Sequence, residues 1–178
     1  MKSGDIVFVQ GRGILARLIR LFDKGTFSHC AIAVSDNKII EAQYFAKVRI
    51  DPFDSSEYNY YEIIDLGLTK EQRNRIVGSS LKRLGKRYDY GQIVWYVLKD
   101  VFHLKGDNRF NNPNNLICSE LAYIVLEESG VMHMLGEPRD GTFRGIDLTP
   151  NQLYDLLKYL SNKKATQKLR DEKGSSVV

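Results

Sequence analysis

The segment SHCAIAVSDNKIIE, residues 28–41, decides the fold, because it predicts two neighbouring strands joined by a tight turn. Side chains alternate between the two faces of a strand, so His29 shares a face with Ala31 and Ala33. Cys30 lies on the opposite face with bulky aliphatic residues, and we therefore interpret that face as core and Cys30 as structural. The two alanines leave a shallow surface on which a helix can pack closely.

The turn between these strands decides which residue faces His29. We predict a three-residue loop, with Ser35 and Asp36 in a type I turn and Asn37 in the left-handed conformation. This register places Glu41 diagonally from His29, where its carboxylate can accept a hydrogen bond from a ring nitrogen. A two-residue turn at Asp36 and Asn37 would instead turn Glu41 away from His29. The other interpretation of Glu41 is a surface carboxylate on an edge strand.

Cys118 begins a second informative segment, ICSEL at residues 117–121, which predicts the start of a helix that ends near residues 129–130. Helical spacing puts Cys118 on the apolar face of this helix, which should pack against the sheet on its alanine face. A helix N-terminus and a nearby imidazolium both favour a thiolate. Cys118 and His29 therefore predict a thiol nucleophile and its base, and the other interpretation is two ordinary buried residues.

The remaining pattern predicts an α+β fold. The strands are expected at residues 5–9, 28–34, 38–44, 46–50 and 60–66, the last four as a contiguous antiparallel meander, and the helices at 14–22, 70–84, 90–104, 118–129 and 150–160. In the first helix Arg17 and Arg20 are predicted on the solvent face. Residues 1–160 thus form one domain, and the basic tail 161–178 is expected to be disordered because it has few apolar residues to bury.

Composition excludes several classes of function. The 178 residues carry 26 Lys plus Arg against 22 Asp plus Glu, and a net charge of +4 is too small and too scattered to indicate nucleic-acid binding. Two cysteines outside any CxxC pair indicate neither a disulfide framework nor structural zinc, so we predict no metal and no cofactor.

The location is expected to be cytoplasmic. Reduced thiols suit the cytosol, and residues 1–9 leave no space for the apolar region of a signal peptide. The longest apolar stretch, residues 93–98, is far shorter than the roughly 20 residues of a membrane span, so stable membrane insertion is not predicted. This stretch is interpreted as part of a core-facing helix, or as the wall of a groove for an apolar substrate.

Six short motifs occur in a characteristic order. They are GDIV at 4–7, SHCAI at 28–32, IIEA at 39–42, GKRYD at 85–89, CSEL at 118–121 and LTPNQL at 148–153. With these motifs the chain resembles the circularly permuted NlpC-like cysteine peptidases, the YiiX/YaeF-like branch of the papain-like superfamily. Papain-like enzymes ordinarily place cysteine before histidine, and His29 preceding Cys118 is what permutation implies.

The resemblance implies a papain-like α+β fold, in which the nucleophile helix and further helices pack on a small antiparallel, barrel-like sheet. It implies that Cys118 is the nucleophile, that His29 is the general base and later the acid, and that Glu41 orients the imidazole. Tyr88 matches a motif tyrosine, and either lines the substrate cleft or packs as an aromatic residue between two helices.

The function implied is a cysteine hydrolase that cleaves an amide bond of a peptide or cell-wall peptide through a thioester acyl-enzyme. Two alternatives remain open at this point. One is a lipid-directed acyltransferase or esterase, similar to the lecithin retinol acyltransferases, and the other is a noncatalytic binding module. The expected partner is accordingly a peptide or an acyl-bearing small substrate.

Overall fold

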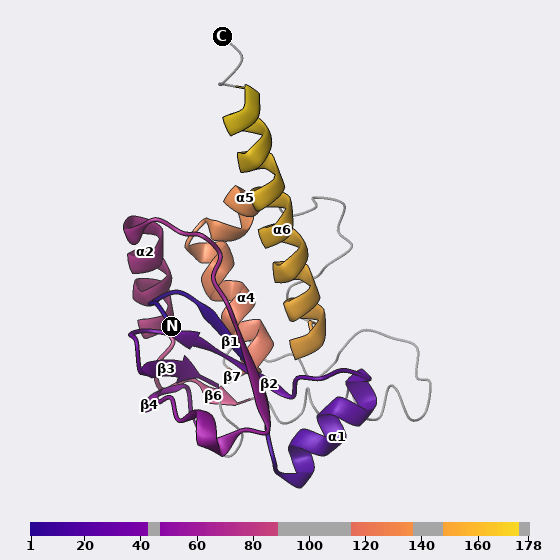
Figure 1. The fold of residues 1–178 in the computed structure, drawn as a ribbon. Helices are drawn as coiled ribbons and strands as arrows, with labels where there is room; N and C mark the ends of the chain where they lie inside the picture. Colours follow the sequence, from indigo (N-terminus) through magenta and orange to yellow (C-terminus); the bar gives the residue numbers. More distant parts are fainter. Residues whose placement is uncertain (43–46, 89–114, 137–147, 175–178) are drawn as a thin grey trace, which may run out of the picture.

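The computed structural model describes residues 1–42, 47–88, 115–136 and 148–174. The predicted helix at 90–104 lies outside these residues. Five strands form one antiparallel sheet in the order β4-β3-β2-β1-β5 (Figure 1). They are β1 (Ile6–Gln10), β2 (His29–Ala33), β3 (Lys38–Glu41), β4 (Arg49–Pro52) and β5 (Tyr60–Ile64).

Two expectations about the sheet need correction. The strand β5 pairs with β1 and not with β4, so the last four strands are not a contiguous meander. The chain crosses from β4 to the other edge through the short 3-10 helix η1 (Ser55–Glu57). The sheet is also open, with β4 and β5 as its edges, and does not close into a barrel.

The hairpin of β2 and β3 has the predicted register. Ile32 pairs with Ile40 and Ala33 with Ile39, and the Val34 amide donates to the Lys38 carbonyl at 2.9 Å. This pairing corresponds to the three-residue loop, which confirms the predicted side of Glu41. The predicted left-handed conformation of Asn37 is wrong, because among the described non-glycine residues only Lys24 has a positive φ.

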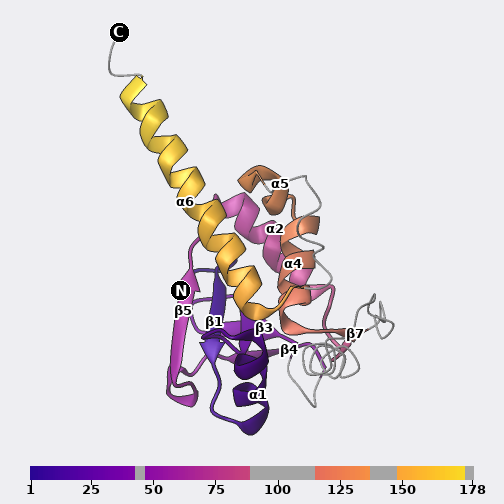
Figure 2. The ribbon, with the colours of Figure 1, turned by 90° about the vertical axis from the view of Figure 1, so that its right-hand side faces the viewer.

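Three helices cover one face of the sheet (Figures 1 and 2). The helix α4 (Cys118–Glu128) contacts β2 and lies between α2 (Lys70–Leu81) and α6 (Pro150–Gly174), while the short α5 (Val131–Leu135) packs against α4 and α6. A large apolar core fills this side of the sheet. A smaller cluster, which includes Ala31 and Ala33, lies on the opposite face.

Local sequence explains where α2 begins. The Thr69 hydroxyl accepts from the Gln72 amide, and the Gln72 side chain accepts from the Thr69 amide, which forms a capping box with Thr69 as the N-cap. The helix ends at Leu81, before the predicted residue 84. Residues 82–85 form turns and lead to β6 (Arg87–Tyr88), which pairs in parallel with β7 (Asn115–Leu116).

The last helix differs from the predicted disordered tail. The helix α6 continues through Ser161 to Gly174, and its end projects away from the body of the molecule (Figure 2). The segment 161–174 has four Lys, together with single Ala, Gln, Leu, Arg and Glu residues, and all of these have high helix propensity. The Lys164 ammonium also donates to the carbonyls of Leu66 and Gly67, which ties the helix to the domain beyond residue 160.

The helix α1 (Ile14–Asp23) connects β1 to β2. Arg17 is exposed as predicted, but Arg20 is half-buried and donates to the Gly11 carbonyl at 2.9 Å. Among the helices of the described residues, none is both long and apolar enough to cross a membrane.

Candidate active site

The structure brings the three predicted catalytic side chains together. Cys118 is the first residue of α4, His29 the first residue of β2, and Glu41 the last residue of β3, and all three are buried. The His29 Nε2 lies 2.6 Å from the Glu41 Oε2. This distance is that of a short, charge-assisted hydrogen bond, which fixes the orientation of the imidazole ring.

The beginning of α6 positions the chain that leads into His29. The Asn151 side chain accepts from the Phe27 amide and donates to the Phe27 carbonyl, each at 2.8 Å, and so pairs with the backbone as a neighbouring strand would. The Asn151 amide also donates to Asp23 at the end of α1. A Cβ at Gly25 would overlap the Asn151 amide, so this approach requires glycine.

The sulfur of Cys118 lies in an environment that favours the thiolate. A hydrogen bond from the Cys30 thiol is the largest cause of a pKa of Cys118 well below its ordinary value, and the charge and hydrogen bond of His29 lower it further. Burial acts in the opposite direction, but it is outweighed. Burial likewise raises the pKa of the Cys30 thiol, which therefore stays protonated and can donate.

The imidazole of His29 lies between two anionic groups. Burial alone would lower the pKa of His29, but the Cys118 thiolate and then the Glu41 carboxylate raise it well above its ordinary value. Burial would raise the pKa of Glu41, and the hydrogen bond and charge of His29 lower it instead. The three groups therefore favour a thiolate, an imidazolium and a carboxylate, a charge distribution suited to nucleophilic attack by sulfur.

The predicted packing of α4 needs correction. The helix covers the face with Cys30, Ile32 and Ile40, and not the alanine face of β2. The face with the larger aliphatic side chains lets the apolar side of α4 remove more apolar surface from water. Cys118 nevertheless reaches His29, because it occupies the first position of α4 and lies beside the first residues of β2.

Three further residues near the sulfur have roles that the sequence does not predict. Cys30 is more than a structural residue, because its thiol donates to the sulfur of Cys118. Ser119 and Glu120 are buried: the Ser119 hydroxyl donates to the Leu148 carbonyl at 2.5 Å, and Glu120 accepts from the Ile117 amide. The signal for the last two was the CSEL motif itself, because polar residues in the first turn of a buried helix usually satisfy backbone groups.

Tyr88 is located only through its backbone. Its strand β6 pairs with β7, with Tyr88 opposite Leu116, two residues before Cys118. The side chain of Tyr88 lies outside the described part of the structure. Its predicted contact with substrate stays a prediction.

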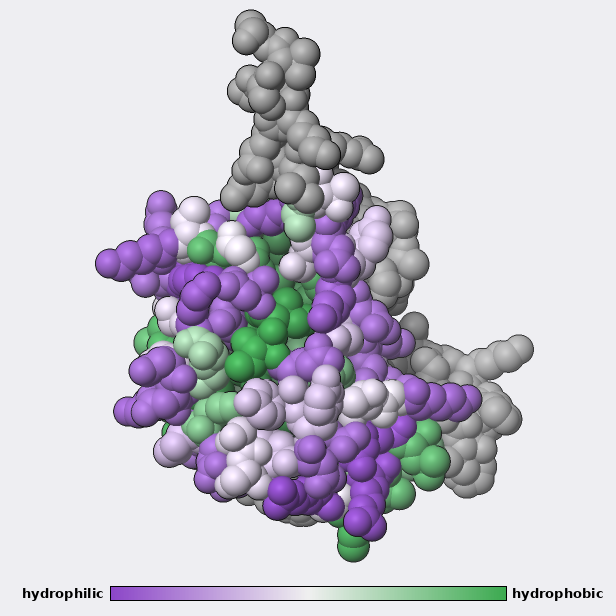
Figure 3. Space-filling model, in the orientation of Figure 1, coloured by the Kyte–Doolittle hydropathy of each residue, from purple (hydrophilic) through white to green (hydrophobic). Residues whose placement is uncertain are grey.

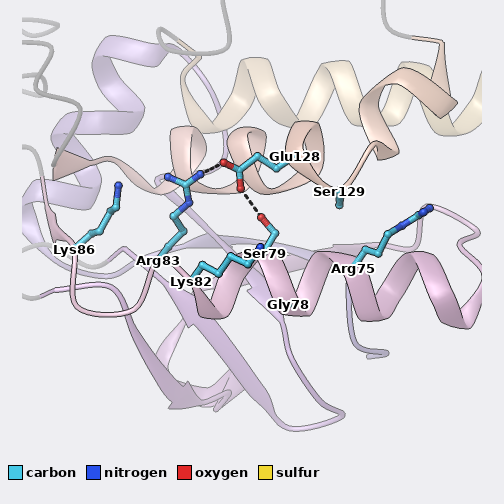
Figure 4. A pocket seen from close by; sticks show the side chains of 8 residues that line it. All are labelled: Arg75, Gly78, Ser79, Lys82, Arg83, Lys86, Glu128 and Ser129. Atoms are coloured by element: carbon cyan, nitrogen blue, oxygen red, sulfur yellow. Dashed lines mark hydrogen bonds and ion pairs between the residues drawn. The ribbon is translucent and has the colours of Figure 1, made fainter.

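A hollow of about 680 Å³ lies elsewhere, between the end of α2 and the end of α4 (Figure 4). Within it, Ser79 and Arg83 both donate to the Glu128 carboxylate and so join the two helices. None of the three predicted catalytic residues lines it. The lining residues are Arg75, Gly78, Ser79, Lys82, Arg83, Lys86, Glu128 and Ser129.

The fold matches a solved structure, the crystal structure of the metalloprotein YiiX from Escherichia coli O157:H7. The two share 19% sequence identity with a TM-score of 0.60, over 87% of this chain and 92% of that chain. This similarity concerns the fold. Within the residues that the structure describes, no group of three or more His, Cys, Asp or Glu side chains could hold a metal ion.

The sequence comparisons identify the family. The chain matches no curated protein. A family model described as "permuted papain-like amidase enzyme, YaeF/YiiX, C92 family" matches residues 1–134, which is most of the chain and includes His29, Glu41 and Cys118. The chain therefore belongs to the permuted papain-like amidases of the C92 family, and it is a cysteine hydrolase of the amidase type.

Proposed function

We propose that this amidase cleaves an amide bond of a peptide substrate, such as a cell-wall peptide, through a thioester acyl-enzyme on Cys118. The observation that carries the proposal is the buried 2.6 Å contact between His29 and Glu41 beside the sulfur of Cys118. In this proposal His29 is the general acid and base, and Glu41 holds the imidazole in place.

The proposed reaction has two steps. The Cys118 thiolate attacks the amide carbonyl carbon and forms a C–S bond, and the imidazolium of His29 gives its proton to the departing amine as the C–N bond breaks. The neutral imidazole then takes a proton from water, whose oxygen attacks the thioester and releases the acid and the thiolate. The backbone N–H of Cys118, in the first helical turn, is the candidate donor to the developing oxyanion.

Alkylation by iodoacetamide tests whether Cys118 is activated. Because its pKa is lowered, Cys118 should react well below about pH 8, whereas an ordinary thiol with a pKa near 8.5 reacts mainly above that pH. In His29→Ala the loss of the imidazolium should shift the reaction to higher pH. Peptide mapping should locate the adduct on Cys118, and Cys118→Ala should show none while folded. Equal pH dependence in the native and His29→Ala proteins would support a noncatalytic module instead.

The pH dependence of turnover tests the role of Glu41. Activity should rise with pH as Cys118 ionises and fall as His29, whose pKa is raised, loses its proton. Glu41→Gln removes a charge that raises the pKa of His29, so the alkaline limb should move to lower pH. We expect kcat/KM to fall about 10²- to 10⁴-fold, as when the orienting carboxylate of a catalytic triad is lost.

The control for Glu41→Gln is Glu57→Gln, an exposed carboxylate in η1, which should leave the profile unchanged. An alkaline limb that stays in place in Glu41→Gln would rule out the proposed orienting role.

The substrate class is tested by comparing two kinds of acyl donor. The protein is incubated with muropeptides and, separately, with phospholipids, each beside Cys118→Ala. We expect new amine and acid ends in the muropeptides, because the family is one of amidases. Release of fatty acid or lysophospholipid without peptide cleavage would overturn the proposal in favour of the lipid-directed acyltransferase or esterase.

A further inference from the structure

The helix α1 presents apolar side chains to solvent. Ile14, Leu18 and Leu21 are 79%, 41% and 68% exposed, and their spacing of four and three residues places them on one face of the helix. Hydrophobic atoms are visible at the lower right edge of the molecule in Figure 3, where α1 lies in Figure 1. A surface helix ordinarily turns such a stripe toward the core.

The side of α1 that faces the protein makes hydrogen bonds through Arg20 and Asp23 and buries one small side chain, Ala16. Arg20 donates to the Gly11 carbonyl at 2.9 Å, and the Asp23 carboxylate accepts from the Thr149 hydroxyl at 2.7 Å. Ala16 is the one residue of this helix that is fully buried. The orientation is therefore set by specific hydrogen bonds, and the apolar stripe is left on the outside.

The charges around the stripe are positive. Arg12, Arg17 and Lys24 are exposed, before, within and after the helix. The only acidic residue of α1 is Asp23, and it is half-buried and bonded to Thr149 and Asn151. An exposed apolar stripe bordered by cations is the pattern of a helix that lies in the interface of an anionic membrane.

We propose that α1 binds in the plane of an anionic lipid surface, with Ile14, Leu18 and Leu21 among the acyl chains and the cations at the headgroups. Such a helix lies on the membrane and does not span it, so its ten residues need not match the thickness of the bilayer. A second copy of the chain fits this surface less well. Two copies that meet at this face across a two-fold axis would bring their cations at positions 12, 17 and 24 close together, with no exposed carboxylate on α1 to compensate.

This contact would orient the candidate active site. The helix α1 lies at the end of the molecule where α4 and α6 begin (Figures 1 and 2), and Cys118 is the first residue of α4. The proposal goes beyond the amidase function and does not depend on it, because the lipid is here a surface and not the substrate. Membrane-bound protein would meet peptide substrates that are held close to the lipid.

Cosedimentation with vesicles tests the proposal. Vesicles of phosphatidylglycerol and phosphatidylcholine are compared with vesicles of phosphatidylcholine alone, using Cys118→Ala so that turnover plays no part. The protein should bind the anionic vesicles, and added salt should weaken the binding. The double variant Ile14→Ser with Leu21→Ser should lower the partition coefficient about tenfold or more, because it removes the two most exposed apolar side chains of the stripe.

The matched control is Leu81→Ser with Leu84→Ser, the last residue of α2 and a leucine in the turn that follows it, which are 41% and 43% exposed. It should bind like the parent protein and melt at a similar temperature. Three results would overturn the proposal: no binding of the parent protein, equal binding to both kinds of vesicle, or equal losses in the two double variants. A lipid-free dimer in sedimentation velocity that only the α1 variant dissociates would instead identify this face as an interface between copies.

Discussion

Replacing Cys118 by serine should lower kcat/KM for a peptide amide by about four orders of magnitude or more, as when the nucleophile of a hydrolase is removed. A serine hydroxyl ionises at far higher pH than a thiol, so the ion pair with His29 cannot form, and no thioester is possible. The measurement is the initial rate of amine release from a substrate that the native protein cleaves, over the pH range in which both proteins stay folded.

The comparison needs a variant of the same helix that leaves the site intact. Ser129→Ala suits this purpose, because Ser129 follows the opposite end of α4, where its hydroxyl donates to the Leu126 carbonyl. Its activity should stay within about threefold of native, even if some stability is lost. A Cys118→Ser protein as active as this control would mean that another group attacks the substrate.

Replacing Arg73 by methionine should destabilise the protein by about 3 kcal/mol, near the lower end of the cost of breaking a buried ion pair. The Arg73 guanidinium donates to the carboxylates of Asp5 and Asp65, each at 2.6 Å, and to the Ser3 and Leu68 carbonyls. Methionine keeps much of the aliphatic packing but leaves the buried Asp5 carboxylate without its cation. Thermal unfolding should show a melting temperature lower by roughly 6–12 °C.

Arg75→Met provides the matched comparison, two positions further along α2. Its guanidinium is exposed and only 3.8 Å from an exposed Glu71 carboxylate, so the change should stay within about 0.5 kcal/mol. If both variants melted at the same temperature, the ion pairs of Arg73 with Asp5 and Asp65 would not stabilise the contact between α2 and the start of β1.

Features decided by near neighbours in the chain were predictable. The number of residues in the turn at 35–37 sets the register of β2 and β3, and through it brings Glu41 to the side of His29. Thr69 and Gln72 cap α2 through contacts three residues apart. In each case the partners are so close in sequence that backbone geometry leaves few arrangements.

Features decided by competition between distant segments were not predictable in the same way. The sequence is compatible with a helix on either face of β2, and α4 packs on the face of Cys30 and Ile32. Because of this packing, the Cys30 thiol donates a hydrogen bond to the sulfur of Cys118. Helical periodicity likewise predicted Arg17 and Arg20 on the solvent face of α1, but the structure leaves Ile14, Leu18 and Leu21 exposed and half-buries Arg20. The hydrogen bonds of Arg20 and Asp23 to Gly11 and Thr149 turn these apolar side chains outward.

By itself, the sequence determined the chemistry available to this amidase: a cysteine at a helix start, a histidine at a strand start, and a carboxylate whose hairpin register faces the histidine. Only the tertiary structure decided that Cys118, 89 residues after His29, meets it in a buried site with Cys30 as a third neighbour. The physical reason is that strand register depends on local backbone geometry, whereas the packing of α4 depends on which apolar surfaces, far apart in the chain, are removed from water together.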